Sequence, residues 1–136
     1  MSSKKYQLIL DSSMEELPRA EEFILNVAGE AGLDNTTTNN LVLAVNEAAV
    51  NAMVHGNKLS KDKKISIDVL IEDNLFQISI KDQGRGFKPE SVPDPTNPEN
   101  LFKESGRGLY IMKSCIHEMK YNFTSEGTEL ILKILL

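Results

Sequence analysis

Two alternating runs of apolar and polar residues in the middle of the chain limit the fold most strongly. In both runs every second position is apolar: Ile65, Ile67, Val69 and Ile71 in the first, and Phe76, Ile78 and Ile80 in the second. The short segment 72–74 separates the runs, so they predict a β-hairpin with one apolar face. An apolar sheet face has to be covered by other elements, and helices are the usual cover.

Further strands are expected near both ends of the chain. Segment 6–10 is β-prone and is followed by the polar cluster Asp11-Ser12-Ser13, which suits a strand followed by a helix cap. Segments 119–124 and 128–135 meet at Glu126-Gly127 and predict a second hairpin.

Three helices are expected, at 14–30, at 37–55 and from near Gly106. The apolar stripe of the second comprises Val42, Val45, Ala49 and Ala52. With the strands, these helices predict an α+β fold. It is a two-layer α/β sandwich, with a mixed, mostly antiparallel sheet of about five strands covered on one face by the helices.

Length and composition narrow the class of protein. We expect residues 1–136 to form a single domain, because 136 residues suit one compact core. The net charge is −5 with interspersed acids and bases, so no basic patch predicts direct nucleic-acid binding. No apolar run reaches membrane-spanning length, and Cys115 is the single cysteine. These features predict a cytoplasmic protein without membrane association.

Residues 87–105 hold four of the five prolines and show little periodicity. Loops of this length in a compact domain usually have a function, often as lids. A lid is therefore expected at about 87–105.

One face of the second helix carries polar residues beside the apolar stripe. Glu47, Asn51 and His55 follow each other at four-residue spacing. Asparagine is a poor residue for a helix interior, so Asn51 needs a partner for its amide. Taken by itself, Glu47 is also explained as an ordinary solvated glutamate on a helix surface. His55 suits the last helical turn, where a histidine complements the helix dipole, and it is not predicted to be catalytic.

A second group of polar residues follows the strand that ends at Ile80. Asp82 keeps the inward parity of that strand, and a carboxylate there needs donors such as the amino group of adenine. Gly84 and Gly86 would let the backbone approach a flat ring, although an ordinary turn with an aspartate at its rim explains the pattern equally well.

Ser105-Gly106-Arg107-Gly108-Leu109 opens the third expected helix, where exposed N–H groups and the helix dipole favour phosphate. A hinge before a helix is the alternative. Thr128 shares the inward parity of the last strand; it suits either a bond to a nearby carbonyl or a contact with a purine held by Asp82. Neither glycine pair completes a dinucleotide-binding or P-loop motif, so those two folds are excluded.

Together these motifs resemble the nucleotide-binding boxes of the Bergerat-fold superfamily, which groups gyrase-type topoisomerases, a heat-shock chaperone, histidine kinases and mismatch-repair ATPases. The matching segments are E-A-A-V-N at 47–51, D-Q-G-R-G at 82–86, G-R-G-L at 106–109 and Gly127-Thr128. Two longer segments are similar to the anti-sigma factor serine-protein kinases of bacterial partner switching. They are N-E-A-A-V-N-A-M-V-H-G-N at 46–57 and D-P-T-N-P-E-N-L-F-K-E-S-G-R-G-L, which ends in the third box.

This resemblance implies ATP and Mg²⁺ as cofactors, Glu47 as catalytic base, Asn51 on magnesium and Asp82 on adenine. The other residues expected at the nucleotide are Gly84, Gly86, Gly106, Arg107, Gly108, Leu109 and Thr128. It also implies a sigma factor and an antagonist protein with a serine phosphoacceptor as partners, and a homodimer.

Three other functions compete with this interpretation. A switch that binds ATP and captures a partner without phosphoryl transfer fits the same motifs. The catalytic domain of a histidine kinase fits poorly, because neither His55 nor His117 stands in a helical hairpin suited to a phosphoacceptor. A metal hydrolase lacks clustered histidine and acidic ligands in the sequence.

Overall fold

The computed structural model describes residues 3–60, 62–83, 116–124 and 127–136, and within them five strands form one sheet. The strands are β1 (Lys4–Asp11), β2 (Lys64–Glu72), β3 (Leu75–Lys81), β4 (Glu118–Thr124) and β5 (Gly127–Leu135). Their order is β1-β2-β3-β5-β4, and every neighbouring pair is antiparallel. Both expected hairpins, β2–β3 and β4–β5, are confirmed. The prediction of a mixed sheet, in which some neighbouring strands are parallel, is wrong for these five strands.

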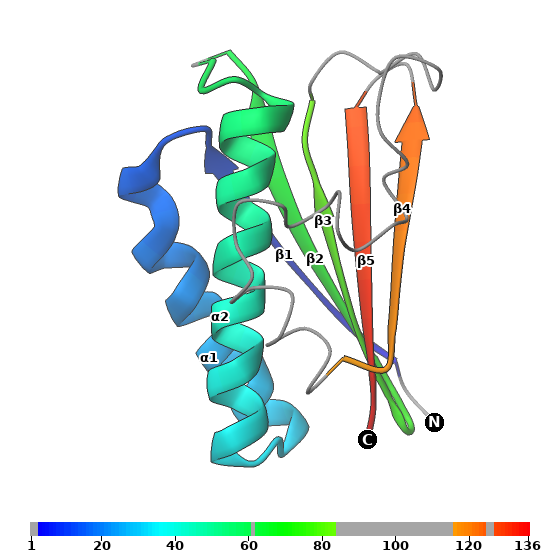
Figure 1. Ribbon diagram of the computed structural model, residues 1–136. Coiled ribbons are helices and arrows are strands. Elements are labelled where there is room, and N and C mark those ends of the chain that lie inside the picture. Colours follow the sequence, from blue (N-terminus) through cyan, green and yellow to red (C-terminus); the bar gives the residue numbers. More distant parts are fainter. Residues whose placement is uncertain (1–2, 61, 84–115, 125–126) are drawn as a thin grey trace.

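Two α-helices cover one face of this sheet in the described part of the chain (Figure 1). A 3₁₀ turn, η1 (Met14–Glu16), precedes α1 (Leu17–Ala31), and α2 (Asn35–Asn51) continues into a π-helical turn, η2 (Ala52–Gly56). The third expected helix from Gly106 and the expected lid at 87–105 lie outside the described residues. No helix within the described ranges is long and apolar enough to cross a membrane.

The ends of the helices follow from local chemistry. Gly32 ends α1 in the left-handed conformation, with φ of 74°, a conformation that glycine adopts without steric cost. Asp34 begins α2, because its side chain accepts a hydrogen bond from the N–H of Thr37 at 2.7 Å. The helix therefore starts at Asn35, two residues before the expected position.

The core lies between α2 and the inner sheet face. Most inward positions expected in the central hairpin are buried, namely Ile65, Ile67, Val69, Phe76, Ile78 and Ile80, whereas Ile71 is only partly buried. On β5, Leu130, Leu132 and Ile134 are buried. The buried residues of α2 are Leu41, Ala44, Val45, Ala48 and Ala49. The expected stripe is thus partly confirmed, since Val42 is only partly buried. Small alanine side chains on this face let the helix lie close to the sheet.

This packing brings together chain ends that are far apart in sequence. The β3–β5 register pairs Lys81 with Glu129, so the residues just beyond, Asp82 and Thr128, are also neighbours. The C-terminal end of α2 lies at this same end of the sheet (Figure 1).

Candidate functional site

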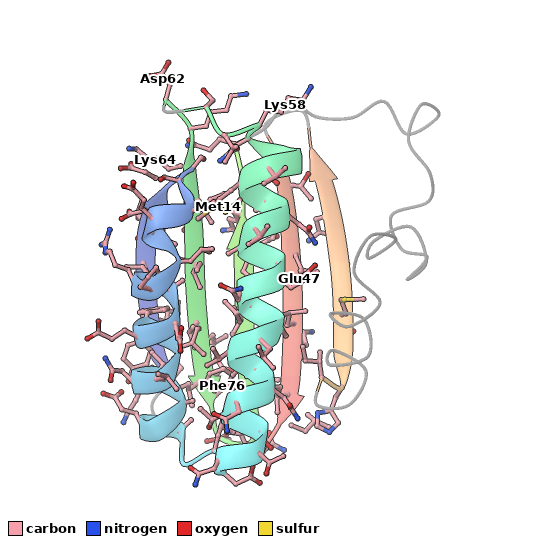
Figure 2. All side chains as sticks on the ribbon, turned by 60° about the vertical axis from the view of Figure 1, so that its left-hand side comes forward. Met14, Glu47, Lys58, Asp62, Lys64 and Phe76 are labelled. Carbon is pink, nitrogen blue, oxygen red and sulfur yellow. The ribbon has the colours of Figure 1, made fainter. Side chains whose placement is uncertain are left out.

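Glu47 and Asn51 lie one turn apart on α2, at the boundary between the core and solvent. Both side chains are half-buried, while Ala48 and Ala49 between them are buried. Figure 2 shows Glu47 midway along the helix, between the end near Lys58 and the sheet end near Phe76. Within the described part of the chain, neither polar side chain forms a hydrogen bond or ion pair. The geometry therefore leaves their oxygens and the Asn51 amide available to another molecule.

Asp82 extends the β3–β5 pairing by one step beyond the last strand residue. Its N–H donates to the carbonyl of Thr128 at 2.9 Å, and its Oδ1 accepts from the Thr128 N–H at 3.1 Å. The side chain thus takes the place of a backbone acceptor in the ladder. This bond fixes the carboxylate at the end of the sheet and ties Asp82 to Thr128, two of the residues that the sequence predicted at the nucleotide.

The carboxylate of Asp82 also touches the helix layer. A Cβ atom on Gly56, the last residue of η2, would overlap Oδ2 and Cγ of Asp82. Because the described helices lie on the inner face of the sheet, this contact shows that the Asp82 side chain points inward. The inward direction is the one that the strand parity predicted.

A second glycine makes room on the other side of Asp82. Gly127, the first residue of β5, has φ of 151°, and a Cβ there would overlap the carbonyl oxygen of Asp82. Any side chain at Gly56 or Gly127 would have to displace the Asp82 backbone or carboxylate. Asp82 is therefore held in a cradle formed by two glycines.

Gly56 follows directly after the helix expected at 37–55, and nothing in the sequence predicts its contact with Asp82. Gly56 is needed for space and has no positive φ; the left-handed residues in this turn are Lys58 and Leu59 instead. The contact that Asn57 makes is likewise not predicted. Asn57 is 1% exposed, and its side chain accepts a hydrogen bond from Gln83, the residue after Asp82. Local pattern gives no signal for either contact, because both join segments that are distant along the chain.

The pair on α2 and the pair at the sheet end belong to one region. Asn51 lies just over one helical turn before Gly56, which touches Asp82. Six other residues predicted at the nucleotide lie outside the described residues: Gly84, Gly86, Gly106, Arg107, Gly108 and Leu109. The described part of the candidate site thus contains Glu47, Asn51, Asp82 and Thr128, and Gly56 and Gly127 make room for Asp82.

The oxygens available here suit a nucleotide with a hard cation. Carboxylate and amide oxygens are ligands that magnesium accepts, and magnesium usually takes one or two protein ligands beside phosphate oxygens. Among the described residues, no group of three or more His, Cys, Asp or Glu could hold a metal ion.

His117 has a structural role in the described sheet. Its Nδ1 accepts the N–H of Leu135 at 3.1 Å, and its own N–H donates to the carbonyl of Lys133 at 2.9 Å. It therefore holds the beginning of β4 beside the end of β5. These bonds leave no reason to assign it a catalytic role.

Comparison with known proteins matches residues 10–134 to the family of histidine kinase-like ATPase domains. This match spans most of the sequence and includes every described residue of the site. The chain belongs to this family. The boxes quoted above from the sequence resemblance fall within the matched range, so that resemblance is confirmed at the level of the family.

Two relatives of this ATPase domain indicate which branch of the family the chain resembles. Serine-protein kinase RsbW of Listeria monocytogenes serovar 1/2a is 22% identical over 134 residues, which cover 94% of this chain and 85% of that protein. The anti-sigma F factor of Geobacillus stearothermophilus is 33% identical over 110 residues, covering 76% and 74%. The expected likeness to anti-sigma factor serine-protein kinases is therefore confirmed.

Solved structures share the fold. The histidine kinase domain of a blue-light activated kinase from Erythrobacter litoralis superposes with a TM-score of 0.59 at 18% identity, covering 88% of this chain and 59% of that one. The RsbU and RsbW domains of a Mycobacterium tuberculosis protein give a TM-score of 0.66 at 17% identity, covering 97% and 32%. At such identities the likeness concerns the fold alone.

Proposed function

We propose that this ATPase domain is an Mg-ATP-dependent serine-protein kinase and anti-sigma factor. It binds a sigma factor and transfers a phosphoryl group to a serine of an antagonist protein. The observation that carries the proposal is the position of Asp82. Its carboxylate is held by the Thr128 N–H at 3.1 Å and touches Gly56, just beyond the helix that bears Glu47 and Asn51.

Asp82 is the residue we assign to the adenine ring. A carboxylate fixed at the end of the inner sheet face can accept a hydrogen bond from the adenine amino group, whereas guanine presents a carbonyl oxygen at the equivalent position. Thr128 lies beside it, with its N–H already bonded to Oδ1. Gly84, Gly86, Gly106, Arg107, Gly108 and Leu109 remain the predicted contacts of the ring and the phosphates.

Asn51 is the residue we assign to magnesium. Its side chain is half-buried on α2 and has no partner among the described residues, so its amide oxygen is available to a cation. Bound magnesium would neutralise charge on the phosphates, which is the main requirement of phosphoryl transfer.

Glu47 is the residue we assign to proton transfer. It lies one turn before Asn51 on the same helix face and is half-buried, so it is within reach of a hydroxyl that approaches the terminal phosphate. Its carboxylate would accept the serine proton while the phosphoryl group passes from ATP to the serine oxygen and ADP leaves.

The partners are proposed from the relatives. The name of one relative is serine-protein kinase and that of the other is anti-sigma F factor. The alignments cover 85% and 74% of these two relatives, so the proposed partners are taken from proteins that match over most of their length.

Incubation with γ-labelled ATP, magnesium and purified candidate antagonist proteins tests the proposal. We expect label on one antagonist serine, located by mass spectrometry. A serine-to-alanine antagonist and the Asn51→Ala chain serve as controls that should remain unlabelled. Tight ATP binding and partner capture without any label would instead favour a binding-only switch, and a chain that binds no ATP would refute both functions.

A further inference from the structure

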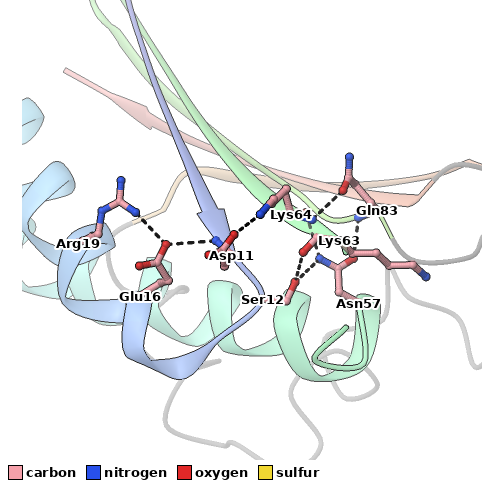
Figure 3. A network of polar contacts seen from close by, with 8 residues as sticks. All are labelled: Asp11, Ser12, Glu16, Arg19, Asn57, Lys63, Lys64 and Gln83. Carbon is pink, nitrogen blue, oxygen red and sulfur yellow. Dashed lines mark hydrogen bonds and ion pairs between the residues drawn. The ribbon is translucent and has the colours of Figure 1, made fainter. Parts of the chain in front are cut away.

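Asn57 is a buried polar residue at the point where the helix layer meets the sheet. It directly follows η2, is 1% exposed and forms three hydrogen bonds to separate segments (Figure 3). Its Nδ2 donates to Ser12 Oγ at 2.7 Å and to the carbonyl of Lys64 at 3.0 Å. Its Oδ1 accepts the N–H of Gln83 at 2.7 Å.

These bonds require an amide in one orientation. The hydroxyl of Ser12 donates to the carbonyl of Lys63 at 2.7 Å, so toward Asn57 its oxygen can only accept. The Lys64 carbonyl also needs a donor, and the Gln83 N–H needs an acceptor. Asparagine supplies two donors and an acceptor in this geometry, while aspartate would lack the donors and an apolar residue would lack all three.

The bond to Gln83 acts on the neighbouring Asp82. The Gln83 N–H belongs to the peptide unit that follows Asp82, while the N–H of Asp82 itself is held by Thr128 at 2.9 Å. The backbone on both sides of Asp82 is therefore fixed, by β5 on one side and by Asn57 on the other. Gly56, which precedes Asn57, touches the Asp82 carboxylate directly.

Two adjacent residues thus couple the end of the helix to Asp82. Gly56 sets how closely the carboxylate approaches, and Asn57 sets the position of the peptide bond through which the chain leaves β3. The same helix carries Glu47 and Asn51. A shift at this junction would move the proposed adenine contact relative to the proposed metal contact.

We propose that Asn57 is a positioning residue that determines the preference for adenine nucleotides. It does so by fixing Asp82 relative to the helix of Glu47 and Asn51. This inference rests on the proposed nucleotide site. It goes beyond a role in folding, because loss of Asn57 should weaken the preference for ATP over GTP as well as lower stability.

Ser12→Ala is the matched control. It removes a buried hydroxyl, 5% exposed, together with its bonds to Asn57 and Lys63, but it leaves the bond between Asn57 and Gln83. Asn57→Ala removes all three bonds of the amide. Asn57→Ser, with a side chain too short to reach the Gln83 N–H, provides a second variant where alanine prevents folding.

Calorimetric titration of the full chain with ATP and with GTP, beside thermal unfolding, tests the inference. We expect Asn57→Ala or Asn57→Ser to weaken ATP binding and to reduce the preference for ATP over GTP. The loss of affinity should be about tenfold, the lower end of the effect of removing a residue that supports a ligand-binding side chain. Ser12→Ala should lower the unfolding temperature and keep the preference.

Three outcomes would overturn it. A folded Asn57 variant with wild-type ATP affinity and preference would show that Asn57 does not position Asp82. An equal loss of preference in Ser12→Ala would show a merely structural role. The third is absence of ATP binding in the wild type, which would refute the proposed function and this inference with it. Normal ATP binding by the wild type therefore distinguishes the first two outcomes from a failure of the proposed function.

Discussion

Gly56 at the end of η2 lies directly against the carboxylate of Asp82 at the end of β3, without room for a Cβ atom between them. This contact joins the helix that carries Glu47 and Asn51 to the strand end that carries the proposed adenine acceptor. The positions of the two halves of the proposed site therefore depend on each other through this glycine, beside the bond of its neighbour Asn57 to Gln83.

Replacing this glycine tests the contact. Gly56→Ala should displace the Asp82 carboxylate, destabilise the fold by about 1–3 kcal/mol as overpacking does, and weaken ATP binding. Gly29→Ala is the control, because a Cβ on Gly29 in α1 meets nothing within 4 Å. Alanine there should stabilise the helix by about 0.5–1 kcal/mol. Urea unfolding and ATP calorimetry on both variants measure the difference, and equal behaviour of the two would refute the contact.

Asp82 should determine adenine specificity. Asp82→Asn keeps an oxygen that can accept the Thr128 N–H, so we expect the fold to persist. Its amide cannot serve as a charged acceptor for the adenine amino group, and ATP affinity should fall about 10- to 100-fold, or ~1.4–3 kcal/mol. The measurement is titration of both proteins with ATP and GTP. Equal affinity of the wild type for the two nucleotides would contradict the assignment.

The start of α2 should respond to acid. The Thr37 N–H bonds to the Asp34 carboxylate and holds its pKa below the usual value. Because the folded pKa lies below the unfolded one, Asp34 stabilises the fold above the unfolded pKa, and this contribution disappears as the pH falls through the folded pKa. Asp34→Asn retains a capping oxygen without this titration. Unfolding free energies measured from neutral pH to pH 3 should therefore decline less in Asp34→Asn, and identical curves would exclude the effect.

The sheet could largely be predicted from the sequence, because its signals are local. Alternation placed Ile65, Phe76 and Leu130 on the inner face, and all are buried. The start of α2 was placed at residue 37 instead of Asn35. Asp34 caps the helix, but the threonines that follow are weak helix formers and obscured its beginning.

The site could be predicted only in its parts. The helix spacing of Glu47 and Asn51 and the parity of Asp82 are properties of single elements, which sequence conveys. The contacts of Gly56 and Asn57 with residues 82 and 83 depend on how the helix end meets the sheet end. The π-helical turn that shapes this end was not expected either, since the helix was predicted to continue regularly to His55.

The central claim is that this ATPase domain transfers phosphate to a protein serine with Glu47 as the base. The most direct test is single-turnover phosphorylation of the antagonist by wild type and Glu47→Gln, with ATP affinity measured in parallel. Glu47 is one turn from Asn51 and far along the helix from Gly56, which contacts Asp82, so ATP affinity should stay nearly unchanged. The transfer rate should fall about 10²–10⁴-fold, as expected for loss of a general base. An unaltered rate in Glu47→Gln, or no transfer by a wild type that binds ATP and its antagonist, would contradict the account.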